Sequence, residues 1–200
     1  MNYAIIGFGS VGQALAAAFA RKGIEVSVAT TRDPESFASD AANIGPTVIP
    51  KKLADAVLAD IIFLAVRYES HPDVAKALST WQGKTIVDVT NAYGVSTEEL
   101  GGESPAHVVA RAFNGSQLVK GFNHLIASTL AEDPAVNGGR RVVFLAGDND
   151  SAVEEVSALA ETLGFSPIAL GGLSESGMLV QARGKQWGQL IFKDLVNFTK

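Results

Sequence analysis

The glycine-rich segment near the start of the chain is the feature that most constrains its fold. An apolar run over residues 3–6 leads into GFGSVG at residues 7–12, and apolar residues then recur at helical spacing up to Phe19. A G-x-G-x-x-G turn between a buried strand and an amphipathic helix is typical of a dinucleotide-binding loop. A glycine turn that binds nothing is the alternative, and the strand and helix on either side argue against it.

Each glycine of this loop has its own task. Gly7 permits the tight turn, Gly9 lets the backbone approach a pyrophosphate, and Gly12 lets the helix pack closely on the first strand. The N-terminus of that helix offers N–H groups and the positive end of its dipole to the phosphates. The residues expected to hold the cofactor here are Gly7, Phe8, Gly9, Ser10, Val11 and Gly12.

The rest of the chain alternates short apolar runs with helical patterns. Continuous apolar strands separated by helices favour a mostly parallel, doubly wound α/β sheet covered on both faces. We expect a Rossmann core over residues 1–125 and a small C-terminal α/β extension over 126–200, packed on the same sheet as one compact domain. Helices are expected from Pro105, from a capping box at Ser151, and in the tail from about residue 175. The expected strands are residues 3–6, 24–29, 47–49, 61–66, 85–89, 118–122, 141–146 and 167–170.

Composition excludes several classes of function. The chain of 200 residues has no cysteine, so it forms no disulfide and has no thiolate zinc site, and its histidines lack metal-ligand spacing; we expect no metal. A net charge of −5 without a basic stripe argues against nucleic-acid binding. No apolar run is long enough to span a bilayer, and the N-terminus lacks a signal-peptide pattern, so we expect a cytoplasmic protein with no membrane contact.

The residues after the second expected strand indicate which dinucleotide binds. An NAD site usually has an acidic residue there for the ribose 2′-hydroxyl, whereas this chain has Thr30, Thr31 and Arg32. Two hydroxyls and a guanidinium suit a 2′-phosphate, so the sequence predicts NADP(H). Two alternatives stay open: Arg32 is a solvated loop residue, or Asp33 serves NAD after a shift of the loop register.

The ends of the fourth, fifth and sixth expected strands should surround the nicotinamide, because ligands bind at the carboxyl edge of such a sheet. We expect cofactor contacts there from Ala65, Val66, Arg67, Asn91 and Asn123. His124 and Asn91 are the candidate catalytic residues, with Tyr68 a further polar candidate. Structural roles compete with each: packing beside the next helix for His124, an Asx turn for Asn91, and a plain loop position for Tyr68 and Arg67.

The chain lacks an evident set of acid and base residues, and this is informative. Oxidation of an alcohol requires a group that takes the hydroxyl proton. Hydride transfer between two ring cofactors requires little beyond orientation, because the cofactors carry the chemistry. The sequence therefore favours a ring-shaped acceptor.

These motifs together resemble the NADPH-dependent oxidoreductases of the deazaflavin coenzyme F-420 and the related NADPH domain of membrane metalloreductases. The later motifs are more specific than the glycine loop, which all Rossmann proteins share. The matching segments are residues 7–12, 30–36, 63–70, 86–94, 118–125, 142–150 and 163–173.

The resemblance implies NADP(H) with a flavin or deazaflavin co-substrate, and a homodimer. It also implies that Thr31 and Arg32 take the 2′-phosphate, and that the Val66 loop, Asn123 and His124 lie near the nicotinamide. The chain departs from the family at three positions and leaves the acceptor open among deazaflavin, ordinary flavin and other molecules. Those positions are Arg67, where proline is frequent, Val180, where glutamate is frequent, and Ser36, where a basic residue is frequent.

Two other functions are weighed beside this one. An NADP-dependent dehydrogenase or reductase of a small hydroxy acid or imine usually adds a long helical domain and a catalytic lysine. Here the residues after the sixth strand include further strand patterns, and Lys185 is the only lysine between Lys120 and Lys193. A non-catalytic module that senses NADPH and binds a partner protein is the third candidate, and no partner motif supports it.

Overall fold

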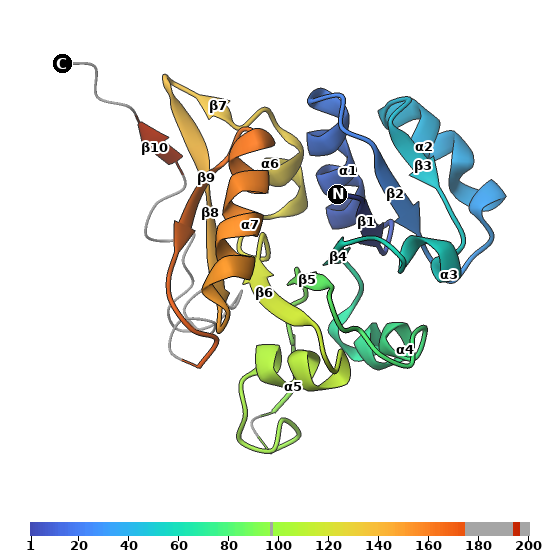
Figure 1. The fold of residues 1–200 in the computed structure, drawn as a ribbon. Coiled ribbons are helices and arrows are strands. Elements are labelled where there is room, and N and C mark those ends of the chain that lie inside the picture. Colours follow the sequence, from blue (N-terminus) through green and yellow to red (C-terminus); the bar gives the residue numbers. More distant parts are fainter. Residues whose placement is uncertain (97, 175–193, 197–200) are drawn as a thin grey trace.

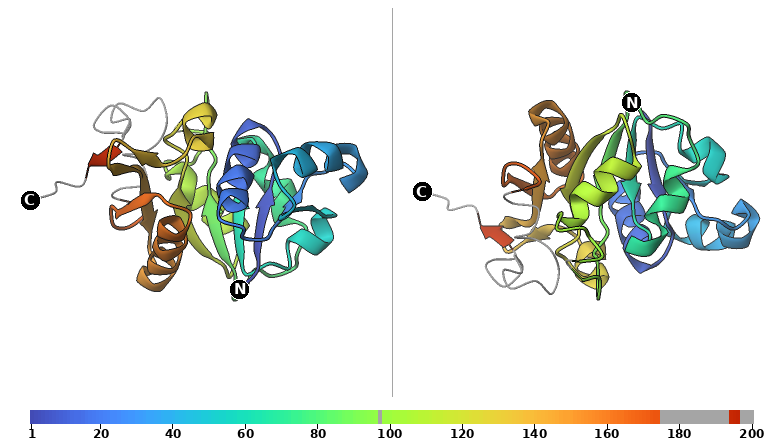
Figure 2. Two further views of the ribbon diagram at one scale, coloured as in Figure 1. Left: turned by 90° about the horizontal axis from the view of Figure 1, so that it is seen from above. Right: turned by 90° about the horizontal axis from the view of Figure 1, so that it is seen from below.

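The computed structural model describes residues 1–96, 98–174 and 194–196, and these form a twisted sheet with helices on both faces (Figures 1 and 2). The sheet runs in the order β3-β2-β1-β4-β5-β6 through parallel pairs and continues to β8, which is antiparallel to β6. The strands are β1 Tyr3–Ile6, β2 Val26–Ala29, β3 Val48–Pro50, β4 Ile61–Leu64, β5 Thr85–Asp88, β6 Gln117–Gly121, β7 Ala135–Val136, β8 Gly139–Gly147, β9 Ser166–Ala169 and β10 Asp194–Val196.

The order of the parallel strands confirms the predicted doubly wound α/β fold, and it places the topological switch point between β1 and β4. β8 pairs with β6 at one end and is antiparallel to β7 and β10 at the other, while β9 lies parallel to it. The C-terminal part thus extends the same sheet, and the boundary at residue 125 stays a prediction. No helix in the described ranges is long and apolar enough to cross a bilayer.

Two hydrophobic cores lie on opposite faces of the sheet. β4 contributes to both: Ile61 and Phe63 pack on the face of α1 and α7, and Ile62 and Leu64 pack on the face of α5. This alternation follows from the side-chain period of a strand that is buried on both faces. The helices are α1 Ser10–Arg21, α2 Ala38–Ile44, α3 Leu53–Ala56, α4 His71–Ala75, α5 Pro105–Ala112, α6 Ala127–Ala131 and α7 Asp150–Thr162, with 3₁₀ turns at Pro34–Phe37 and Tyr68–Ser70.

Two sequence expectations need correction. The helix α7 begins at Asp150 instead of at Ser151, because the Asn149 side chain is the N-cap and accepts a hydrogen bond from the N–H of Ala152 at 2.9 Å. The helix expected in the tail lies outside the described residues over 175–193, and residues 194–196 form a strand, β10.

The glycine loop seats α1 directly on β1. A Cβ atom on Gly12 would lie 2.0 Å from the carbonyl oxygen of Gly7. Gly7 itself has a φ of +103°, and a Cβ there would lie 2.3 Å from the carbonyl oxygen of Ala65 after β4. The loop therefore requires glycine at both positions for backbone packing alone.

We expect Gly12→Ala to lower the free energy of unfolding by about 1–3 kcal/mol, because the added methyl group must displace backbone atoms. Urea denaturation of the variant and the wild type measures the difference.

Gly9→Ala is the matched control, since a Cβ at Gly9 would meet no described residue within 4 Å beyond its chain neighbours, and the φ of −81° suits any residue. The control should change stability by less than about 0.5 kcal/mol. Equal stability of the Gly12→Ala variant and the wild type would contradict the packing argument.

Candidate functional site

A cavity of about 600 Å³ opens where β1, β4, β5 and β6 end. Its wall begins at the first turn of α1 and continues through the loops that follow the three other strands. The cavity therefore lies at the switch point of the sheet, where open α/β folds bind their ligands. Its lining residues are Gly9, Ser10, Val11, Ala65, Val66, Arg67, Tyr68, Glu69, Val89, Thr90, Asn91, Tyr93, Phe122, Asn123, His124, Leu125, Ile126 and Ala127.

The structure brings most of the sequence-predicted site residues to this cavity. It places Gly7, Phe8 and Gly12 behind the wall, and it places Thr30, Thr31 and Arg32 beyond it at the end of β2. The roles of all these residues stay predictions. The predicted residues that line the cavity are Gly9, Ser10, Val11, Ala65, Val66, Arg67, Asn91, Asn123 and His124.

The first turn of α1 fits a pyrophosphate. Gly9 is the N-cap of this helix, it provides no side-chain cap, and the first turn contains no acidic residue. The N–H groups there are thus open to an anion, which the helix dipole also attracts. Among the described residues, no atom other than those of Gly9 and its two chain neighbours lies within 4 Å of a Cβ position built on Gly9, so a phosphate can approach the backbone.

Arg32 is an exposed cation at the end of β2. Its guanidinium carbon lies 5.8 Å from the centre of the Phe37 ring, and Phe37 packs on Phe8 of the glycine loop with ring centres 5.6 Å apart. Thr30 Oγ1 accepts a hydrogen bond from the Arg32 N–H at 2.9 Å and fixes the turn. In the described ranges Arg32 forms no ion pair, so its charge is available to a 2′-phosphate.

Asn91 and Asn123 form a reciprocal pair across the cavity floor. The amide of Asn91 donates from Nδ2 to the carbonyl oxygen of Asn123 at 2.9 Å, and Asn123 Nδ2 donates to Asn91 Oδ1 at 3.0 Å. The pair joins the loop after β5 to the loop after β6. Asn91 is therefore more than the residue of a local Asx turn, which was the structural alternative.

A buried ion pair beneath this floor was not predicted from the sequence. Lys120 on β6 donates from Nζ to Asp88 Oδ2 on β5 at 3.0 Å, and both side chains are almost fully buried. Burial lowers the pKa of Lys120, and the Asp88 carboxylate partly opposes that shift. A lysine and an aspartate inside two otherwise uncharged strands were the available signal.

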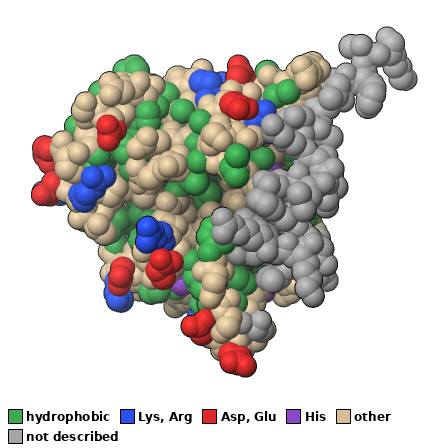
Figure 3. Space-filling view, turned by 180° about the vertical axis from the view of Figure 1, so that it is seen from behind, with side chains coloured by type: hydrophobic (Ala, Val, Ile, Leu, Met, Phe, Trp, Pro, Cys, Tyr) green, Lys and Arg blue, Asp and Glu red, His purple; other side chains and the backbone are tan. Residues whose placement is uncertain are grey.

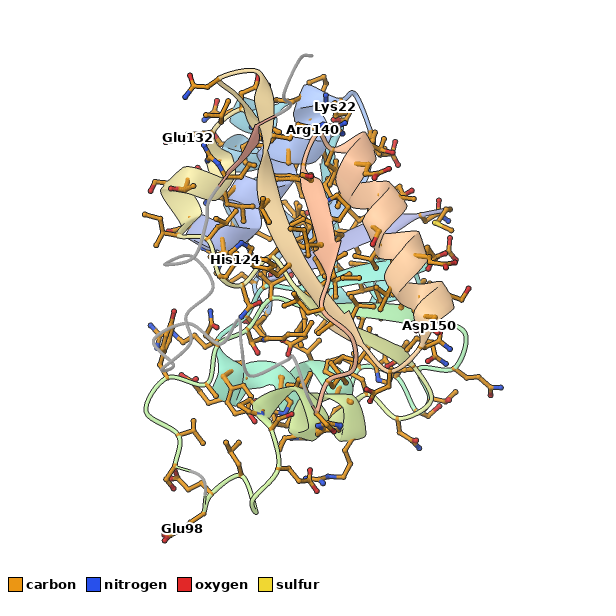
Figure 4. All side chains as sticks on the ribbon, turned by 90° about the vertical axis from the view of Figure 1, so that its left-hand side faces the viewer. Lys22, Glu98, His124, Glu132, Arg140 and Asp150 are labelled. Atoms are coloured by element: carbon orange, nitrogen blue, oxygen red, sulfur yellow. The ribbon has the colours of Figure 1, made fainter. Side chains whose placement is uncertain are left out.

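His124 lies deep beside β8 (Figure 4). Its ring is 1% exposed and sits 4.9 Å from the Phe144 ring. Nε2 donates to the carbonyl oxygen of Val142 at 3.2 Å, a role that requires the proton on Nε2. Nδ1 has no partner among the described residues. Burial lowers the pKa of His124 to about 4. The imidazole is therefore neutral at pH 7 and offers Nδ1 as an acceptor only.

Comparison with known families gives a match over the N-terminal half of the chain. The family model described as NADP oxidoreductase, coenzyme F420-dependent, matches residues 2–92. That segment contains β1 to β5, the glycine loop, Arg32 and Asn91.

Two solved structures and one curated relative extend the likeness across the chain. A hypothetical protein from Sinorhizobium meliloti is 37% identical with a TM-score of 0.89, covering 99% of this chain and 96% of that one. An F420-dependent NADP-reductase described from Arthrobacter sp. FB24 is 25% identical with a TM-score of 0.71, covering 100% of both chains. Metalloreductase STEAP2 of Mus musculus is 32% identical over 174 residues, which are 86% of this chain. The match spans only 34% of that relative's length.

We expect the imidazole of His124 to titrate near pH 4 in NMR spectra, because its burial disfavours the charged form. The same shift makes the neutral ring a source of stability. This contribution is complete above the ordinary pKa of 6.5 and is lost as the pH falls towards 4. His124→Gln identifies the signal, and a midpoint at 6.5 would contradict the buried, neutral state.

Proposed function

Because the chain belongs to the family of coenzyme F420-dependent NADP oxidoreductases, we propose that it transfers hydride between NADP(H) and a flavin-like or deazaflavin ring. The observation that carries this proposal is the cavity, which begins at a dinucleotide-binding loop and has a rim with exposed apolar side chains. When bound, NADP(H) would supply or take up the hydride, and the acceptor ring would gain or lose it together with a proton exchanged with solvent.

The described residues provide a place for each part of NADP(H). The first turn of α1 would bind the pyrophosphate, and Thr31 with Arg32 would bind the 2′-phosphate. Ala65, Val66 and the Asn91–Asn123 pair would surround the nicotinamide. Two orphaned buried atoms beside the cavity, Tyr68 Oη and Thr90 Oγ1, have no hydrogen-bond partner among the described residues. Ligand groups or ordered water can satisfy such atoms.

The rim of the cavity favours a flat apolar acceptor. Tyr93 is 55% exposed and Ile126 is 56% exposed, and both line the cavity. Large exposed apolar side chains at a cavity mouth are typical of ligand contact. The neutral His124, almost fully buried in the cavity wall, is poorly suited to take a proton from an alcohol. These features support orientation of two rings as the main task of the protein.

The charge pattern of the surface bears on the partner class. Figure 3 shows acidic and basic side chains interspersed on the face opposite the view of Figure 1. A small redox molecule fits this surface better than a polyanion does. The homodimer implied by the resemblance stays a prediction, since no observed contact tests it.

The acceptor is tested by following NADPH oxidation at about 340 nm with deazaflavin coenzyme, FMN, FAD or no acceptor. We expect strong turnover with one of the three ring acceptors, because the cavity would hold both rings against each other. Tight NADPH binding without turnover would contradict the proposal. It would then favour a small hydroxy acid or imine substrate, or a sensing module.

We expect Arg32→Glu to weaken NADPH binding at least tenfold, or about 1.4 kcal/mol, because the 2′-phosphate loses a charge-assisted pair and meets a carboxylate. NADH binding should be equal or better, and isothermal titration calorimetry measures both.

Lys22→Glu is the matched control. It makes the same change of charge at the C-terminal end of α1, away from the glycine loop. It should leave both affinities unchanged. If NADPH affinity survives the substitution of Arg32, that residue does not select the cofactor.

A further inference from the structure

The Asp88–Lys120 pair is built into the sheet directly beneath the cavity. The register of β5 and β6 places Asp88 opposite Lys120, and their side chains are 0% and 1% exposed. The cavity-lining residues Val89 and Phe122 follow within two positions of the pair. The ion pair thus lies where both strands give way to the loops of the site.

The pair holds the backbone of Thr90 from both sides. Asp88 Oδ1 accepts the N–H of Thr90 at 2.9 Å, and Lys120 Nζ donates to the carbonyl oxygen of Thr90. That carbonyl belongs to the peptide group that leads into Asn91. The orientation of Asn91 is therefore set by a salt bridge that never reaches the cavity surface.

The loop after β6 is tied, through Asn91, to the segment that the Asp88–Lys120 pair holds. Asn91 and Asn123 exchange two hydrogen bonds, and Phe122 between Lys120 and Asn123 has a φ of +60°. A left-handed backbone is unfavourable at a residue other than glycine. The buried Phe122 ring packs edge-on against Phe63 and Phe165, at 5.5 Å and 5.7 Å, and these contacts hold the turn in place.

Neither feature is explained by stability. A buried ion pair is often no more stabilising than a well-packed apolar pair of the same volume, because desolvation offsets the attraction. A strained turn lowers stability outright. The ion pair and the left-handed turn both lie at the edge of the cavity. Proteins accept strain and buried charge at such places in order to fix the geometry of a site.

We propose that Lys120 is a positioning residue for the nicotinamide end of the site, acting with Asp88 through the Thr90 backbone on the Asn91–Asn123 pair. This inference rests on the proposed binding of NADP(H) in the cavity. The fit of the nicotinamide then depends on Lys120, a side chain that does not touch the nicotinamide. The fit of the adenosine end depends instead on α1 and Arg32.

The test compares two ligands by isothermal titration calorimetry: NADPH, and 2′-phospho-ADP-ribose, which is NADP without its nicotinamide. We expect Lys120→Met to weaken NADPH binding about tenfold, the scale of one lost buried charge-assisted contact. The affinity for 2′-phospho-ADP-ribose should stay within about twofold, because Arg32 and the glycine loop are unchanged.

A second variant separates the loss of positioning from the destabilisation caused by a buried Asp88 carboxylate that has lost its partner. Lys120→Met with Asp88→Asn removes both charges and keeps a side-chain oxygen for the N–H of Thr90. We expect this double variant to regain the melting temperature lost by Lys120→Met, and to keep its weak NADPH binding. Recovery of NADPH affinity in the double variant would overturn the positioning role.

Lys84→Met is the control. Lys84 precedes β5 and donates from Nζ to the carbonyl oxygens of Leu58 and Ala59, so it holds backbone at the opposite end of the sheet. It should bind both ligands as the wild type does.

Equal losses for both ligands in Lys120→Met, or no loss for either, would overturn the inference. Failure of the proposed NADP(H) binding is distinct, because the wild type would then bind neither ligand; failure of hydride transfer alone would leave wild-type binding intact.

Discussion

The contact between the carbonyl of Gly7 and the backbone of Gly12 determines how the cofactor side of the molecule is built. Because neither residue has a side chain, α1 rests on the loop it grows from, and the loop rests on Ala65 after β4. This contact brings the N-terminus of α1 to the gap between β1 and β4. The position of the cavity and of the expected anion site both follow from it.

Local patterns predicted the parallel half of the sheet well, because strands buried on both faces are short, mainly apolar runs separated by loops and helices. β1 was predicted to the residue, and the later strands to within a few positions. The start of α7 was misplaced because Asn149 and Ser151 are both good N-caps, and only tertiary context chooses between them. The antiparallel direction of β8 could not be read from its composition, since an apolar run reads alike in both directions.

The difference between local patterns and tertiary context also explains which parts of the site could be predicted from the sequence. Residues after strand ends could be predicted as neighbours, because parallel strands end at one edge of the sheet; Asn91 and Asn123 are the example. The Asp88–Lys120 pair was missed because it depends on the register between β5 and β6, which no local pattern encodes. For His124 the structural alternative gains weight from its burial, and its catalytic role stays a prediction.

The two walls of the cavity are held by different parts of the chain, and this bears on how acceptors differ within one fold. The wall beside the glycine loop belongs to the ends of β1, β4 and β5. The other wall follows β6 into α6, whose last turn receives hydrogen bonds from Arg21 of α1 to Ala131 and from Arg141 of β8 to Thr129. Ile126 at the start of α6 is left exposed at the rim. A helix that is anchored at its end and exposed at its beginning can present a different surface at the rim without disturbing the glycine loop. The two walls of the cavity can therefore change independently of each other within one architecture.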